Sequence, residues 1–278
     1  MIQIQCLTEY EQLQKVVLCQ PTYMSIEEAI NEIQAHYKKA NINRGIAQSE
    51  HQMLVETLRK HGVDVMLISA NEECPEQVFT RDIGFVIEDT LYVGHLKRDI
   101  RKKEREQLLQ FLQQEKIPYH EIEAGTIEGG DVVLAQSDVF IGNSGRTAKV
   151  TLELLQMRHP NHSFHLIDFD EKYLHLDCVF NPISESEALI YPPAINEESL
   201  KIIQRKYDCI EVDDEEQFSL AVNILSLGHR KIVALPKNEQ TNRKLIERGF
   251  EVIEIDFSEI IKSGGSFRCV TLPLRRNN

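Results

Sequence analysis

The sequence of 278 residues contains no apolar run close to the roughly 20 residues that cross a membrane. Its first residues, Met1 to Cys6, lack the basic region and the long apolar stretch of a secretory signal. Positive charge is also in deficit, because 31 Lys and Arg stand against 44 Asp and Glu, a formal net charge of -13. Proteins that bind nucleic acids need a basic face, so neither a nucleic acid nor a membrane is expected as a partner.

Paired cysteines are absent as well. The six cysteines lie far apart, and none belongs to a Cys-x-x-Cys pair, so the pattern is neither a zinc site nor a disulfide scaffold. A reduced, cytoplasmic setting is therefore expected. The composition is typical of a globular protein with a large core, and no low-complexity linker divides it. We expect a single domain over residues 1–278.

A pattern of a helix followed by a short strand recurs along the chain. Helical spacing of apolar residues marks 26–37, 47–61, 104–114, 147–157, 197–207 and 242–248, and strands are expected at 13–19, 63–68, 119–122, 164–167, 209–212 and 250–255. Strand pairs resembling hairpins follow at 84–88 with 90–93, 131–135 with 139–142, 178–181 with 187–191, and 220–225 with 231–235. A fifth pair would join 269–272 to the N-terminal strand at 16–19. The strands recur every 40 to 55 residues or so, which favours five α/β units in one closed domain over an ordinary α/β sheet with similar loop lengths.

Polar residues recur at one phase of these units, just before the first strand of each hairpin. The segments are Phe79-Thr80-Arg81-Asp82, Glu128-Gly129-Gly130-Asp131, His175-Leu176-Asp177, Asn223 and Cys269. Each has a structural explanation of its own, such as a turn cap for Asp82 or a core position for His175. Units related by rotation would nevertheless bring these positions together at the axis, and their recurrence favours a common pocket.

Such a pocket suits a planar cation. Carboxylates around a thiol raise its pKa unless a positive charge intervenes, and a guanidinium supplies that charge and pairs with carboxylates. We expect a guanidinium between Asp82 and Asp177, with its carbon facing the Cys269 sulfur. His175, oriented by Glu128, would protonate the departing amine and activate water. Zinc-dependent hydrolysis is the competing chemistry, but a single histidine without ligand spacing argues against it, so no metal is expected.

The four motifs, in this order and closed by Gly264-Gly265 before Cys269, resemble those of the guanidino-modifying (pentein) superfamily. This superfamily includes arginine deiminases, dimethylarginine dimethylaminohydrolases and amidinotransferases. The resemblance extends from Phe79 to Cys269, and the chain length is most similar to the dimethylaminohydrolases. It implies a five-fold pseudosymmetric α/β propeller of ββαβ-type units, a covalent thiouronium intermediate and no cofactor.

The resemblance also implies roles for single residues. Cys269 would be the nucleophile, His175 the acid and base, and Glu128 its carboxylate partner or a ligand of the substrate. The expected substrate-binding residues are Asp82, Asp177, Asp131, Phe79, Arg146 and Arg101. Of these, Arg146 would hold the substrate carboxylate, and Arg101 would be a second arginine for the same group. A solvated position at a helix start is the alternative for either arginine.

One departure bears on the substrate. The animal dimethylaminohydrolases are expected to have His-Leu-Lys where this chain has His175-Leu176-Asp177, and the Asp form resembles the deiminases and amidinotransferases. The resemblance therefore implies hydrolysis of arginine or a substituted arginine to citrulline plus an amine or ammonia. The alternatives are an amidinotransferase, which passes the amidino group to an amine, and a non-catalytic ring protein. The partner would be a small guanidino compound, a homodimer is compatible with the sequence, and Gly94–Arg101 is a candidate lid.

Overall fold

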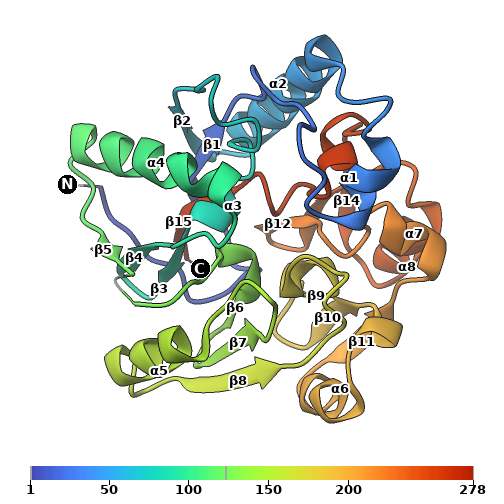
Figure 1. Ribbon diagram of the computed structural model, residues 1–278. Helices are drawn as coiled ribbons and strands as arrows, with labels where there is room; N and C mark the ends of the chain where they lie inside the picture. Colours follow the sequence, from blue (N-terminus) through green and yellow to red (C-terminus); the bar gives the residue numbers. More distant parts are fainter. Residues whose placement is uncertain (1, 123, 278) are drawn as a thin grey trace.

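The computed structural model describes residues 2–122 and 124–277, which form five separate three-stranded sheets. Figure 1 shows these sheets grouped around the middle of the molecule, with the long helices outside them. The strands are β1 Leu13–Cys19, β2 Asp64–Ile68, β3 Gly84–Ile87, β4 Thr90–Val93, β5 His120–Glu121, β6 Val132–Ala135, β7 Asp138–Gly142, β8 Ser163–Ile167, β9 Phe180–Pro182, β10 Glu187–Ile190, β11 Asp208–Glu211, β12 Leu225–Gly228, β13 Lys231–Ala234, β14 Glu251–Glu254 and β15 Leu272–Arg276. The helices are α1 Glu32–Tyr37, α2 Arg44–Lys60, α3 Thr80–Ile83, α4 Lys102–Gln114, α5 Lys149–Arg158, α6 Glu197–Gln204, α7 Asp214–Phe218 and α8 Glu239–Glu247. Within the described residues no helix is both long and apolar enough to cross a membrane.

Every sheet is built in the same way. An antiparallel pair is extended by a parallel third strand, as in β6-β7-β8, where Val132 pairs with Ile141 and Asp138 with Ser163. The third strand is reached through a crossover helix, because parallel neighbours cannot be joined by a tight turn. These helices are α2, α4, α5, α6 and α8. The predicted mixed α/β fold of repeated units is therefore confirmed.

Burial decreases across each sheet from its first strand to its third strand. The first strands β3, β6, β9 and β12 are buried at every residue. The third strands β2, β8 and β14 begin exposed, and β2 and β8 become buried only at their last residue. The crossover helices cover the sheets with apolar side chains; Leu108 and Leu112 of α4, for example, share a cluster with Phe85 and Val93. Burying one such leucine contributes about 2 kcal/mol. The first strands therefore lie innermost, and the residues that precede them face the interior.

The two ends of the chain share one sheet. Strand β1 pairs antiparallel with β15, with Val17 opposite Leu272, and parallel with β2. This confirms the predicted pairing of the last strand with the first. The predicted strand over 269–272, however, was wrong in its bounds. Residues 266–271 form a helical turn, in which the Val270 amide donates to the Ser266 carbonyl at 3.1 Å, and β15 starts only at Leu272.

The same correction applies to other inner strands. Those predicted at 178–181 and 220–225 begin at Phe180 and Leu225, because short turns come first. The helix predicted over 26–37 covers only Glu32–Tyr37, and the five-residue helix α7 was not predicted. A tight turn before each inner strand is thus a shared feature of the units, and these turns carry the polar motifs.

Candidate active site

Four hydrogen-bonded links and one close backbone approach join the five turns into a closed circuit. The Arg81 amide of α3 donates to the Cys269 carbonyl at 3.0 Å, and the Asn223 side chain accepts from the Cys269 amide at 3.2 Å. The other side of the Asn223 amide donates to the Asp177 carbonyl at 3.2 Å.

The circuit closes through the glycine turn. The Leu176 amide donates to Asp131 Oδ1 at 3.0 Å, which joins the His175 turn to the Gly129-Gly130 turn. At Gly129 a Cβ atom would lie 2.1 Å from the Arg81 carbonyl oxygen, so only glycine permits this approach to α3. The motifs that the sequence predicted to converge are therefore brought together.

His175 is held between two carboxylates. Its Nε2 lies 2.7 Å from Glu128 Oε2, and its Nδ1 lies 3.5 Å from Asp82 Oδ1. Burial alone would lower the pKa of His175, but the charges of Asp82, Glu128 and Asp131 outweigh it and raise the pKa to about 9. Burial likewise opposes ionisation of Glu128, yet His175 and Arg146 hold the pKa of Glu128 well below its usual value. The pair is therefore an imidazolium and a carboxylate at neutral pH.

Two buried polar atoms at this point, His175 Nδ1 and Asp82 Oδ1, lack a hydrogen-bond partner among the described residues. The His175 ring packs directly on Gly130, because a Cβ there would lie 2.6 Å from His175 Nδ1. Leaving a buried donor or acceptor unpaired costs about 1 to 3 kcal/mol, so these atoms are positioned for a ligand.

Arg101 already places a guanidinium on Asp82. Its Nη1 donates to Asp82 Oδ2 at 2.6 Å, while its Nη2 and Nε donate to Glu104 at 2.8 and 3.0 Å. The side chain is 1% exposed. Arg101 was predicted to hold the substrate carboxylate, but in this structure it is engaged by the chain's own acids.

Cys269 lies fully buried in the turn before β15. Its Sγ lies 3.7 Å from Asp177 Oδ2. Burial first, and then the carboxylates of Asp177 and Asp82, raise the pKa of the Cys269 thiol well above its usual value. The thiol is therefore neutral in this state. Phe79 packs beside it, since a Cβ on Gly265 would lie 2.4 Å from the Phe79 ring and 3.0 Å from the Cys269 Cβ.

Asp177 is paired within the chain. Arg268 Nη1 donates to Asp177 Oδ2 at 2.5 Å, and Arg268 Nη2 donates to Glu9 Oε1 at 3.1 Å. Glu9 also accepts from Arg81 at 3.1 Å. This network was missed by the sequence reasoning. The signal that could have revealed this network is Arg268, the cation directly before Cys269. Its guanidinium faces the carboxylates of Asp177 and Glu9.

The Asp131 carboxylate joins two loops through three hydrogen bonds. The hydroxyls of Ser144 and Thr147 and the Leu176 amide donate to its two oxygens, with Thr147 at 2.6 Å. Burial raises the pKa of Asp131 to about 6 against these donors. It was predicted to contact substrate, whereas its acceptor sites here are used to join two loops.

A small inner cavity of about 10 Å³ adjoins the thiol. Its lining includes Cys269, Asp82, Phe79, Arg101 and Glu76. That volume holds about one water molecule. Glu76 was not predicted; it accepts from Gln34 and Ser263 at 2.9 Å each, and burial raises the pKa of Glu76 to about 8.

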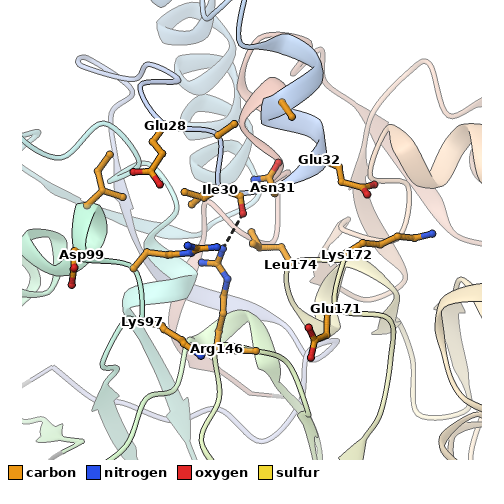
Figure 2. A pocket seen from close by; sticks show the side chains of 15 residues that line it. Glu28, Ile30, Asn31, Glu32, Lys97, Asp99, Arg146, Glu171, Lys172 and Leu174 are labelled. Carbon is orange, nitrogen blue, oxygen red and sulfur yellow. Dashed lines mark hydrogen bonds between the residues drawn. The ribbon is translucent and has the colours of Figure 1, made fainter.

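A larger outer pocket of about 820 Å³ lies beside this cavity and shares Ile30, Asn31 and Leu174 with it. Figure 2 shows Arg146 rising through this pocket toward the Ile30 carbonyl, which its Nη2 reaches at 3.4 Å. Arg146 Nη1 also donates to Glu128 Oε2 at 3.2 Å. Lys97 and Arg98, from the segment predicted as a lid, line the same pocket. Arg146 therefore connects the outer pocket to the His175 and Glu128 pair.

Asp82, Glu128 and His175 also have the proximity of metal ligands, with one atom of each within 4.8 Å of the others. Arg101 and Arg146 already place positive charge on these two carboxylates. A guanidinium group therefore fits these three side chains as well as a metal ion does.

Comparison with known proteins identifies the family. Residues 20–276 match the family described as N,N dimethylarginine dimethylhydrolase, eukaryotic. The chain belongs to this dimethylarginine dimethylhydrolase family. The match also confirms the guanidino-modifying superfamily that the motifs resemble.

Relatives of this dimethylhydrolase family member support the same grouping. The chain is 46% identical over 271 residues to protein YkgA of Bacillus subtilis, which covers 98% of this chain and 95% of YkgA. It is 26% identical over 259 residues to the arginine deiminase of Streptococcus gordonii, which covers 74% of this chain and 62% of the deiminase.

Solved structures share the fold of this dimethylhydrolase family member. The N-terminal domain of ArgZ, an arginine dihydrolase from cyanobacteria, superposes with a TM-score of 0.86 at 21% identity, over 96% of this chain and 98% of that domain. SxtG, an amidinotransferase from Microseira wollei, superposes with a TM-score of 0.83 at 18% identity, over 99% of this chain and 98% of SxtG. The family as a whole acts on guanidino groups, and the fold is common to hydrolases and transferases.

Proposed function

We propose that the chain is a cysteine-dependent hydrolase that attacks the guanidinium carbon of arginine or a substituted arginine. The products are citrulline and an amine or ammonia. The observation that carries the proposal is the unfilled hydrogen-bonding capacity of two atoms. Asp82, which lines the Cys269 cavity, has an unpaired Oδ1, and the unpaired His175 Nδ1 lies 3.5 Å from it. A guanidinium N–H can donate to Asp82 there, and a departing amine can receive the His175 proton.

Binding in this proposal begins with an exchange of guanidinium groups. The inner cavity is too small for a substrate, so the substrate guanidinium takes the place that Arg101 holds on Asp82. Glu76 supplies the second acid, because its neutral carboxyl ionises when a cation arrives beside it. Asp177 stays paired with Arg268, so it presents no free carboxylate to the substrate.

The covalent steps follow from the same groups. The substrate cation stabilises the Cys269 thiolate, so the thiol releases its proton to solvent when the substrate binds. The sulfur then forms a bond to the guanidinium carbon. His175 donates its proton to the departing nitrogen as the C–N bond breaks, leaving the thiouronium. Glu128 stabilises the imidazolium before this transfer. A water molecule then gives a proton to His175 and attacks the same carbon, and the C–S bond breaks to release citrulline and the thiol.

The cavity favours hydrolysis over transfer. The cavity of about 10 Å³ beside Cys269 already has room for one water molecule, which is the acceptor that hydrolysis requires. We further propose that Arg146 holds the substrate α-carboxylate in the outer pocket and that Asp131 positions the His175 turn. The five sheets would be the blades of one pseudo-five-fold propeller domain over residues 1–278. Neither a cofactor nor a metal takes part in the proposed steps, and the cytoplasmic setting and the homodimer stay predictions.

The test is a product assay with two matched cysteine variants. Purified protein is incubated with arginine, monomethylarginine, dimethylarginine or agmatine, with and without glycine, and citrulline, released amine and guanidinoacetate are quantified. Cys269→Ser should abolish turnover. Cys178→Ser is the control, because that thiol is also buried and lies 3.7 Å from the other Asp177 oxygen. Equal activity of both variants would eliminate the thiol mechanism, and guanidinoacetate in the glycine arm would establish a transferase.

A further inference from the structure

A second cluster of ligand-type side chains lies away from the thiol site. Glu88, in the hairpin between β3 and β4, faces His159 and His162, in the loop between α5 and β8. His159 Nδ1 lies 3.2 Å from Glu88 Oε2, and His162 Nδ1 lies 4.0 Å from Glu88 Oε1. One ligand atom of each residue lies within 4.8 Å of the other two.

His162 provides the independent observation that points to a ligand. Its side chain is 7% exposed, and its Nδ1 lacks a hydrogen-bond partner among the described residues. A hydrogen bond to Glu88 accounts for His159, but 4.0 Å is too long to account for His162 in the same way. A buried imidazole nitrogen without a partner, aimed at a carboxylate, is what a metal ion bound between them would require.

We propose that Glu88, His159 and His162 form a site for a divalent ion of borderline softness, with Zn²⁺ as the best fit. Two imidazoles and one carboxylate are a common zinc ligand set, and bonds of about 2.0 to 2.1 Å at tetrahedral angles separate ligand atoms by about 3.3 Å. The His159 to Glu88 distance already matches this separation. Glu88 is 44% exposed, so its carboxylate is free to shift toward His162 and water has access to the fourth position.

The surroundings hold the ligands in place. Tyr92 Oη lies 2.8 Å from His159 Nε2, the outer hydrogen bond that orients a metal-binding histidine. The Glu88 backbone has a φ of 56° and exchanges two hydrogen bonds with Cys6, at 2.8 and 2.9 Å. The ion would thus join two neighbouring sheets at a distance from the thiol chemistry.

The experiment is a Zn²⁺ titration of the full chain by calorimetry, with every protein in a Cys269→Ser background so that the active-site thiol is removed. The proposal expects one ion per chain with micromolar or tighter affinity. His162→Gln should weaken binding at least tenfold, and Tyr92→Phe by about tenfold with unchanged stoichiometry. His229→Gln, at an exposed histidine of the β12 and β13 hairpin, should bind as the parent does.

Glu88→Gln provides a second variant at a more exposed side chain in case His162→Gln does not fold. Cobalt(II) substitution in the Cys269 parent gives a spectroscopic readout. Tetrahedral visible bands without a thiolate charge-transfer band support the site, whereas a thiolate band that disappears in Cys269→Ser places the ion at Cys269. Millimolar or absent binding, or binding that neither Glu88→Gln nor His162→Gln weakens, would overturn the proposal.

Discussion

The buried His175 should make the stability of the fold depend on pH in a defined window. Its pKa rises from 6.5 to about 9 on folding, because Asp82, Glu128 and Asp131 outweigh its burial. The folded chain therefore binds this proton more tightly than the unfolded chain. The resulting stability is fully present below about pH 6.5 and is lost as the pH rises through about 9.

The size of the effect follows from the shift. A change of about 2.5 pKa units at 1.36 kcal/mol per unit corresponds to about 3 kcal/mol. Most of this stabilisation remains at pH 7, and almost none remains at pH 10. The Glu128 shift describes the same ion pair from the other side, so the two are not added.

Urea unfolding between pH 6 and pH 10, followed by circular dichroism because the chain has no tryptophan, measures the effect. The free energy of unfolding of the wild type minus that of His175→Gln isolates the histidine from the other titrating groups. This difference should fall by about 3 kcal/mol across the range. His229→Gln, the same substitution at an exposed histidine, serves as the control. A flat difference for His175→Gln between pH 7 and pH 10 would refute the ion pair with Glu128.

Three further outcomes are expected. Glu76→Gln should change the free energy of unfolding by less than about 1 kcal/mol, because the acid is neutral at pH 7, yet raise the KM for arginine in steady-state assays. Gly130→Ala should lower kcat by about 100-fold through displacement of His175, while Gly145→Ala, whose Cβ would meet nothing within 4 Å among the described residues, should leave kcat unchanged. Arg268→Met should cost about 3 to 5 kcal/mol in urea unfolding by leaving Asp177 and Glu9 unpaired, and a loss below 1 kcal/mol would contradict that pairing.

The repeated architecture could be predicted because its signals are local. Each crossover helix and its third strand follow from apolar spacing within about 25 residues, and the β1 and β15 pairing follows from closing the repeat. The turn around Cys269 could not be read in the same way. Its alternation resembles a strand, but the Asn223 side chain, 46 residues away in sequence, binds the Ser266 and Cys269 amides and stabilises a helical turn instead.

The ion pairs of the site show a second limit of prediction from the sequence. Arg101 was predicted to hold the substrate carboxylate, with a solvated basic face as the alternative, because it lies in a basic stretch with Arg98, Lys102 and Lys103. Only its Glu104 partner is close in sequence, whereas Asp82 is 19 residues away. The Arg268 and Glu9 pair spans 259 residues. Sequence motifs therefore predicted which residues converge, and pairing across the fold decided which of them are free to meet a substrate.

Those pairings give the substrate-free site a balanced charge, which explains why its thiol stays neutral. Ten buried groups are linked by ion pairs: Glu9, Arg81, Asp82, Arg101, Glu104, Glu128, Arg146, His175, Asp177 and Arg268. Five are cations and five are anions, and Asp131 adds a carboxylate held by hydroxyls and an amide, so an additional thiolate would stand uncompensated in a medium that screens charge poorly. A bound guanidinium supplies the positive charge that stabilises the Glu76 carboxylate and the Cys269 thiolate beside it. The nucleophile would thus form mainly when its substrate is in place, and an empty pocket would leave the sulfur as an unreactive thiol.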